Sequence, residues 1–212
     1  LKKKGWWHKS NYLIWFDNYE TWTIIEDLID DIIEDCMGSG LYNSLVSSFG
    51  NNRINIIIND ESYDSSYNRY YNKMTIGKDI TDDCLFHEMF HAYQSAKNHD
   101  NDSYYNSTLN MDIEAHYVQY KYLCSKQEQN KWGAGSNEPR FYAIAKLDEF
   151  ITDDITMRDN LTEIDIDNYL YIVANAFRYN NVYGDTSVYL YNDSIIGLQN
   201  FKSLKEIVKN CS

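Results

Sequence analysis

The sequence predicts an α+β fold in which a small N-terminal sheet precedes a mainly helical C-terminal lobe. An amphipathic helical pattern comes first, short strand patterns follow it, and helical patterns fill most of the remainder. We expect a single domain over residues 1–212, with an N-terminal lobe at 1–98 and a helical lobe at 99–212. The chain should be folded, because 43% of its residues are hydrophobic and it contains one proline.

The clearest helical pattern covers residues 21–36. Its apolar residues recur at helical spacing: Ile24, Ile25, Leu28, Ile29, Ile32, Ile33 and Cys36. Its acidic residues occupy the other positions: Glu26, Asp27, Asp30, Asp31, Glu34 and Asp35. We interpret the acidic face as solvated, and we expect the segment Gly38-Ser39-Gly40 to end the helix.

Two strand patterns follow. Residues 53–60 alternate isoleucine with other side chains, as in a strand with one buried face, and residues 73–77 predict a second short strand. The intervening residues 62–72 are rich in Tyr, Ser and Asn and indicate a loop or an irregular hairpin. We expect the strand at 54–58 to lie at an edge of the sheet.

A second helix is predicted from Thr81 to about Lys97. Thr81 has the character of an N-cap, and the carboxylates of Asp82 and Asp83 would complement the dipole in the first turn. Further helices are predicted at about 111–126, 140–150, 164–179 and 204–209.

The charge and cysteine content argue against several functions. The formal net charge of −13 opposes binding to nucleic acid or to anionic membranes, because phosphate recognition depends on clustered Lys and Arg. The basic run at residues 2–4 is interpreted as a solvated tail. No apolar stretch reaches the length of about 18 residues that a membrane span needs. The four cysteines form no CxxC pair, which argues against a thiolate zinc site and leaves any disulfide pairing open.

The second helix carries the sequence His87-Glu88-Met89-Phe90-His91. Two histidines four residues apart leave the same face of a helix one turn apart, so both imidazoles can bind one metal ion. Glu88 follows the first histidine directly and can accept a proton from a water molecule beside the metal. This pattern predicts a hydrolytic zinc centre with His87 and His91 as ligands and Glu88 as general base.

The HExxH motif resembles that of the zincin metallopeptidases, and the resemblance implies a zincin-like fold. A metzincin would place its third ligand six residues after His91, where Lys97 stands, and His99 is out of register. Glu114 on the following helix resembles the third ligand of the gluzincins, with Asp112 and His116 as alternatives. The sequence has Val118 where thermolysin-like enzymes have an aspartate, so the group that would orient a ligating histidine is unassigned.

The resemblance implies a peptidase that binds Zn²⁺ through His87, His91 and Glu114 and cuts a protein or peptide substrate held along a sheet edge. Candidate oxyanion donors are Tyr117, Arg178, Tyr183 and Tyr189. We expect a secreted or cell-surface domain of a larger bacterial protein, such as a polymorphic-toxin effector. The alternative is a zincin-like binding or structural module without catalysis, in which any metal serves stability alone.

Overall fold

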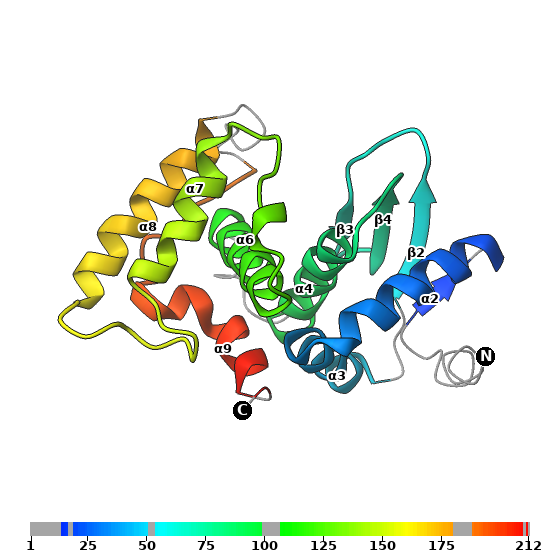
Figure 1. Ribbon diagram of the computed structural model, residues 1–212, viewed down its shortest axis with the longest axis horizontal. Helices are drawn as coiled ribbons and strands as arrows, with labels where there is room; N and C mark the ends of the chain where they lie inside the picture. The colour runs from blue at the N-terminus through cyan, green and yellow to red at the C-terminus, as the bar shows by residue number, and fades with distance from the viewer. Residues whose placement is uncertain are drawn as a thin grey trace. The chain divides into compact units, whose positions relative to one another are not determined.

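The computed structural model describes residues 14–16, 19–50, 54–98, 107–179, 188–209 and 211. The chain divides into two compact units, Leu1–Lys97 and Asn98–Ser212. Both helices and strands are present, which confirms the α+β class (Figure 1).

The N-terminal unit contains a four-stranded sheet with the order β1-β2-β4-β3. The strands β1 (Ile14–Phe16), β2 (Ile54–Asn59) and β4 (Lys73–Gly77) are parallel, and β3 (Ser66–Asn68) pairs antiparallel with β4 at one edge. Because β2 lies between β1 and β4, the prediction of an edge strand at 54–58 is wrong. Alternating polarity identifies a strand, but its neighbours are set by pairing with distant segments.

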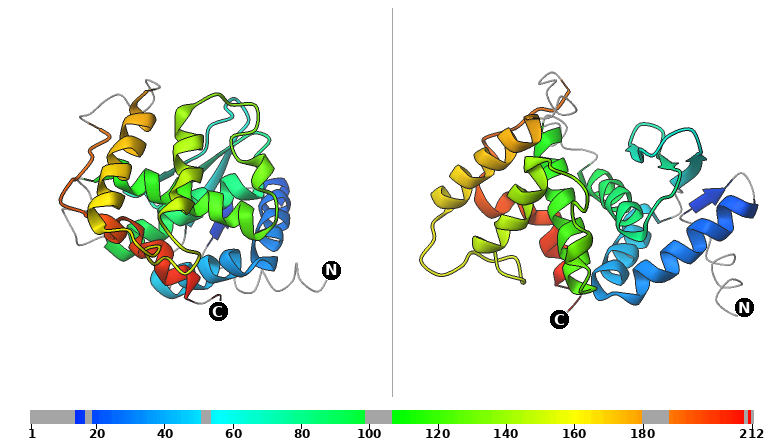
Figure 2. Two further views of the ribbon diagram at one scale, coloured as in Figure 1. Left: turned by 60° about the vertical axis from the view of Figure 1, so that its left-hand side comes forward. Right: turned by 45° about the horizontal axis from the view of Figure 1, so that its top comes forward.

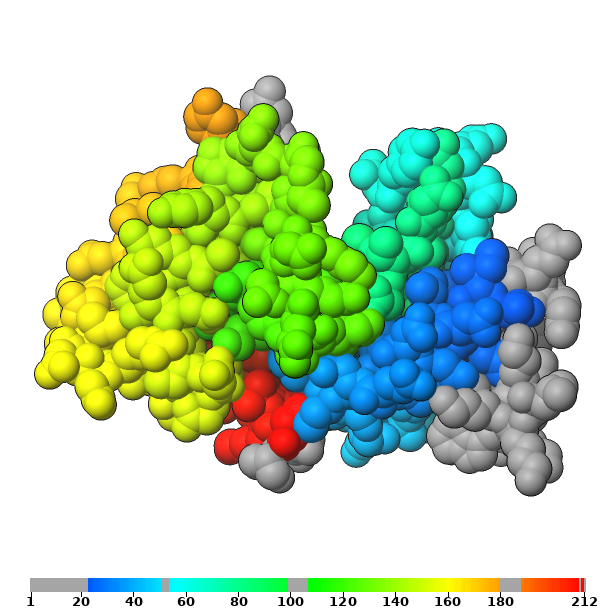
Figure 3. Space-filling view, in the orientation of Figure 1, coloured from blue at the N-terminus to red at the C-terminus, as the bar shows by residue number. Residues whose placement is uncertain are grey.

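The segment around β3 projects from the N-terminal unit in Figure 3. It carries three exposed tyrosines, Tyr63, Tyr70 and Tyr71. Gly77 at the end of β4 holds this segment close, because a Cβ there would lie 2.4 Å from the carbonyl carbon and oxygen of Tyr63. The segment predicted as a loop or an irregular hairpin contains the short strand β3, which forms a hairpin with β4 through a turn at residues 69–72.

The first predicted helix is followed by a second helix that the sequence pattern does not predict. Helix α2 spans Tyr19–Glu34 and α3 spans Cys36–Phe49, and both lie along one side of the sheet (Figures 1 and 2). Asp35 separates them and caps α3, because its side chain accepts hydrogen bonds from the backbone N–H groups of Met37 (2.8 Å) and Gly38 (3.3 Å).

The expectation that residues 38–40 end a helix is therefore wrong. Gly38 lies inside α3, where a Cβ would be 1.8 Å from the carbonyl oxygen of Ile32. The glycine permits the close approach of the two helices at the Asp35 bend. Glycine signals a helix end only where no other contact requires the absence of a side chain.

One member of the acidic face of α2 is buried. Glu26 is 2% exposed, whereas Ile24, which was placed on the packing face, is 47% exposed. The buried stripe centres on Ile25, Ile29 and Ile32, and Glu26 lies on its flank. The prediction of a fully solvated acidic face is therefore wrong at this position, because apolar spacing alone did not fix the centre of the stripe.

The regular secondary structure of the described residues of the C-terminal unit is helical, apart from one isolated bridge between Ile151 and Met157. Its elements in chain order are α6 (Thr108–Ser125), η1 (Gln129–Lys131), α7 (Pro139–Ala145), η2 (Lys146–Glu149), α8 (Glu163–Arg178), η3 (Gly197–Phe201) and α9 (Lys202–Val208). The predicted helices at 111–126, 140–150, 164–179 and 204–209 are confirmed to within a few residues.

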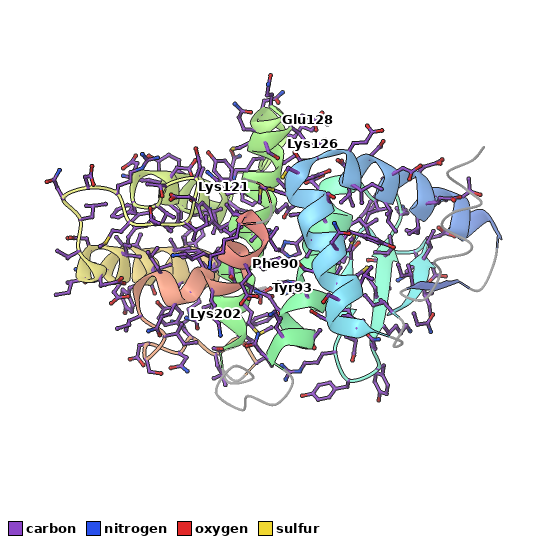
Figure 4. The ribbon with its side chains drawn as sticks, turned by 90° about the horizontal axis from the view of Figure 1, so that it is seen from below. Phe90, Tyr93, Lys121, Lys126, Glu128 and Lys202 are labelled. Carbon is purple, nitrogen blue, oxygen red and sulfur yellow. The ribbon has the colours of Figure 1, made fainter. Side chains whose placement is uncertain are left out.

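Helix α6 is buried on almost every face and forms the centre of this unit. Its Lys121, labelled in Figure 4, is itself buried, and its Nζ forms ion pairs with Asp148 at 3.3 Å and with Asp153 at 2.5 Å. Asp148 also accepts a hydrogen bond from the Tyr117 hydroxyl at 2.7 Å. The buried ammonium group of Lys121 is thus paired, as a buried ion must be. None of the described helices is long and apolar enough to span a bilayer.

Candidate metal centre

The candidate metal centre lies on α4, which spans Asp82–Asn98. The helix begins as predicted, because the carbonyl of Thr81 accepts the first helical hydrogen bond from Leu85 and two acidic residues occupy the first turn. Most of α4 is buried, including Phe90 and Tyr93, whose ring centroids lie 6.2 Å apart (Figure 4). The aromatic anchors fix the rotation of the helix and hence the face on which the two histidines lie.

The two imidazoles of the motif converge as the spacing predicts. His87 Nε2 and His91 Nε2 are 3.1 Å apart, and the rings meet edge to face with an interplanar angle of 83°. Two nitrogen ligands of one tetrahedral zinc ion, each about 2.0–2.1 Å from it, lie roughly 3.3 Å apart. The observed separation is thus close to that required of a ligand pair. In the metal-free protein the same separation allows one imidazole to donate a hydrogen bond to the other.

Gln94 orients the second imidazole. His91 Nδ1 lies 2.9 Å from Gln94 Oε1, and Gln94 is fully buried. Since the amide oxygen only accepts, the Nδ1 nitrogen carries the proton and the lone pair of the ring is on Nε2. This is the tautomer that a metal ligand needs, with its other nitrogen held by a hydrogen bond. The orienting residue unassigned from the sequence is therefore Gln94, one turn after His91.

The donor set suits zinc. Neutral imidazoles are ordinary zinc ligands, and the Nε2 atoms already face one another. Metal binding would require His87 to carry its proton on Nδ1, so that both Nε2 lone pairs are available. The residues of α4 therefore fit two of the ligand positions of a zinc ion.

Glu88 is part of the same helix and is 7% exposed. Its neighbours along the helix include the buried apolar residues Leu85, Met89 and Ala92 as well as the two histidines. A carboxylate in such surroundings is costly unless it has a specific role, such as interaction with a cation or proton transfer. The burial agrees with a functional glutamate.

The predicted third ligand, Glu114, lies on α6 in the C-terminal unit. It is 3% exposed, and its Oε1 accepts a hydrogen bond of 2.9 Å from the backbone N–H of Leu204. Leu204 belongs to the first turn of α9, whose N–H groups have no partner within the helix. Glu114 therefore caps α9 within its own unit. Its assignment as a metal ligand stays a prediction from the sequence.

The alternatives to Glu114 differ in their surroundings. His116 is buried in an aromatic cluster, with its ring centroid 5.1 Å from that of Phe177 and 6.0 Å from that of Trp132. That packing explains His116 without a metal. Asp112 is only partly buried and is the more accessible carboxylate of α6. His99 lies outside the described residues.

The structure removes Tyr117 from the candidate oxyanion donors. Tyr117 is fully buried and donates its hydroxyl to Asp148, and burial followed by the Asp148 charge raises its pKa well above the ordinary value. It is therefore a core residue, which removes it from the candidates. Burial, followed by the charge of Asp112, also raises the pKa of Tyr189. Arg178 is partly buried at the end of α8, and Tyr183 lies outside the described residues.

Comparisons with protein-family models, with curated proteins and with solved structures give no match for this chain. Its function is therefore inferred from its residues and their geometry.

Proposed function

We propose that the chain is a zinc-dependent peptidase in which His87 and His91 bind the metal and Glu88 is the general base. The observation that carries the proposal is the convergence of the two Nε2 atoms at 3.1 Å, with His91 held in the metal-binding tautomer by Gln94. A buried glutamate directly after the first histidine supports a hydrolytic role, because a purely structural zinc site has no need of a base.

The residues of the chain would have the following roles in the reaction. When bound, zinc would polarise the scissile carbonyl and lower the pKa of a water molecule. Glu88 would accept the proton of the attacking water and pass it to the leaving amine. From the sequence, Glu114 is proposed first and Asp112 second as the carboxylate that would complete the ligand set.

The sheet offers a place for an extended substrate. β3 pairs with β4 on one side, and it is the terminal strand of the sheet order on the other. An edge strand presents unpaired backbone N–H and C=O groups to which a peptide can add as a further strand. β3 therefore replaces 54–58 as the strand proposed to bind substrate, which favours unfolded segments over folded proteins as substrates.

The decisive variant for the reaction is Glu88→Gln. It removes the proton acceptor but keeps the size of the side chain, so zinc content should be unchanged while cleavage of a denatured, fluorescently labelled protein falls at least about 100-fold. Glu61→Gln, a substitution of an exposed glutamate of the same unit, should leave the rate unchanged. Normal cleavage by Glu88→Gln would refute the proposed base.

The predicted location as part of a secreted or cell-surface bacterial protein, including a toxin effector, stays a proposal. If the chain is an effector, its expression in a bacterial host should slow growth, and Glu88→Gln should restore growth. Equal growth of cells that express the two forms at the same level would argue against the effector role.

A further inference from the structure

The outer face of α8 carries an apolar stripe that the candidate metal centre does not use. Four large side chains are more than half exposed: Ile164 (70%), Tyr171 (60%), Ile172 (56%) and Tyr179 (75%). Asn168 and Asn175 are exposed between them. At about 100° per residue, these six positions fall within roughly 100° of the helix circumference, so they form one continuous face. Exposed apolar side chains aligned in this way mark an interaction surface.

The six residues of the stripe have the same spacing whether they are counted from the N-terminal or from the C-terminal end of α8. The intervals between successive members are 4, 3, 1, 3 and 4 residues. The residue types repeat as well, because each half of the stripe reads Ile, Asn, Tyr. A face with this symmetry can pair with a copy of itself in the antiparallel direction. Ile164 would then meet the second copy's Tyr179, Asn168 would meet the second copy's Asn175, and Tyr171 would meet the second copy's Ile172.

The spacing also suits helix packing. The stripe contains three pairs of residues seven apart: 164 with 171, 168 with 175, and 172 with 179. A seven-residue repeat keeps a seam facing a partner helix along its whole length. The two asparagines would face one another across the seam, where their amides can hydrogen-bond. A polar residue at such a position fixes the register of paired helices.

The charges of α8 favour the same orientation. Its first turn contains Glu163 and Asp165, and its last turn contains Arg178. Antiparallel pairing brings the acidic end of each helix beside the basic end of the other, and it also opposes the helix dipoles. Parallel pairing would place like charges together.

The neighbouring helix α7 carries a further exposed aromatic side chain. α7 packs beside α8, where the Tyr169 hydroxyl donates a hydrogen bond of 2.9 Å to the carbonyl oxygen of Ala143. Tyr142 of α7 is 74% exposed. α8 lies at the periphery of the C-terminal unit in each ribbon view, so a second molecule can approach it (Figures 1 and 2).

We propose that the outer face of α8 is a homodimer interface, in which a second copy of this chain binds antiparallel through Ile164, Asn168, Tyr171, Ile172, Asn175 and Tyr179. Such an interface is isologous, since the same patch serves both copies. It is independent of the zinc centre and holds whether or not the chain is a peptidase.

Sedimentation velocity of the full chain over a range of micromolar concentrations tests the proposal. The unmodified chain should dimerise, and Tyr171→Glu or Ile172→Glu should raise the dissociation constant at least about 100-fold, because each substitution occurs twice in the dimer. Ile24→Glu, at an exposed isoleucine of α2 outside the stripe, is the matched control and should leave the dimer intact. Circular dichroism melting verifies that each variant is folded, as expected for substitutions of exposed side chains.

Cross-linking tests the orientation. In a background with the exposed free Cys84 replaced by serine, a mixture of Asn168→Cys and Asn175→Cys chains should form a disulfide-linked heterodimer on mild oxidation. Each variant alone should cross-link far less. A monomer at every concentration would overturn the proposal, and it would mean that another part of the chain or another protein covers the stripe. A dimer unaffected by Tyr171→Glu, or efficient cross-linking of Asn168→Cys with itself, would equally overturn it.

Discussion

Replacing Gln94 by leucine is expected to weaken zinc binding about 10- to 100-fold while the chain stays folded. Gln94 is fully buried, and its Oε1 holds the Nδ1 of His91 at 2.9 Å. Leucine keeps most of the side-chain volume but leaves the imidazole N–H without its acceptor, and an unsatisfied buried donor costs about 1–3 kcal/mol. Every 1.4 kcal/mol corresponds to about tenfold in affinity. That range agrees with the usual effect of removing a residue that orients a metal ligand.

The assay is a competition titration of zinc between the purified chain and a chromophoric chelator. Gln94→Glu is the matched control, because it keeps an acceptor oxygen at the same position and should retain zinc affinity. Thermal unfolding of the metal-free forms separates loss of the site from loss of the fold. Unchanged zinc affinity in a folded Gln94→Leu chain would refute the assignment of Gln94 as the group that orients His91.

Two further predictions concern stability. Lys121→Met should lower the free energy of unfolding by about 1–3 kcal/mol, because it removes the cation that pairs with Asp148 and leaves that carboxylate only its hydrogen bond from Tyr117. The hydrogen bond and charge of Lys121 also lower the pKa of Asp153. The Lys121–Asp153 ion pair therefore stabilises the fold at a pH above the ordinary carboxyl range, and this stabilisation is lost as the pH falls through the lowered pKa. The difference in unfolding free energy between the unmodified chain and Lys121→Met, measured by urea denaturation, should narrow on acidification. Gly38→Ala should cost about 1–3 kcal/mol, because its Cβ would meet the carbonyl oxygen of Ile32 at 1.8 Å. A Gly38→Ala chain that melts at the original temperature would contradict the close approach of α2 and α3.

The elements that depend on local pattern were predictable. The start of α4 followed from a capping residue and acidic residues in the first turn, and the helical spacing of residues 87 and 91 correctly gave convergent imidazoles. Both features are set within one or two helical turns, where side-chain direction is fixed by backbone geometry.

The features that depend on distant contacts were not predictable. The sequence pattern predicted a helix end at Gly38, because the contact that requires a glycine there is with the backbone of Ile32 in another helix. The interior position of β2 required knowledge of β1, which carries no strong strand signal. Gln94 is different, because its contact with His91 is local; the spacing of one turn between the two residues could have identified it from the sequence.

The hydrogen bond of Glu114 also depends on a distant contact that the sequence does not predict. The position of Glu114 on the helix after the motif suggested a ligand. The structure shows that it is buried and adds a hydrogen bond to the first turn of α9 that no local pattern encodes. A glutamate can serve one role with each carboxylate oxygen, so capping of α9 and metal binding are not exclusive. Glu114→Gln would keep the capping acceptor but remove the charge, and zinc titration of that variant separates the two roles.

The central claim is that His87 and His91 form a zinc site, and the most direct test is the metal content of the purified chain. Purification without chelator, followed by elemental mass spectrometry, should give about one zinc ion per chain for the unmodified protein. The variant with both His87→Ala and His91→Ala should contain almost none while remaining folded. An unmodified chain that contains no zinc and does not bind it on addition, or a double variant that retains zinc, would contradict the claim.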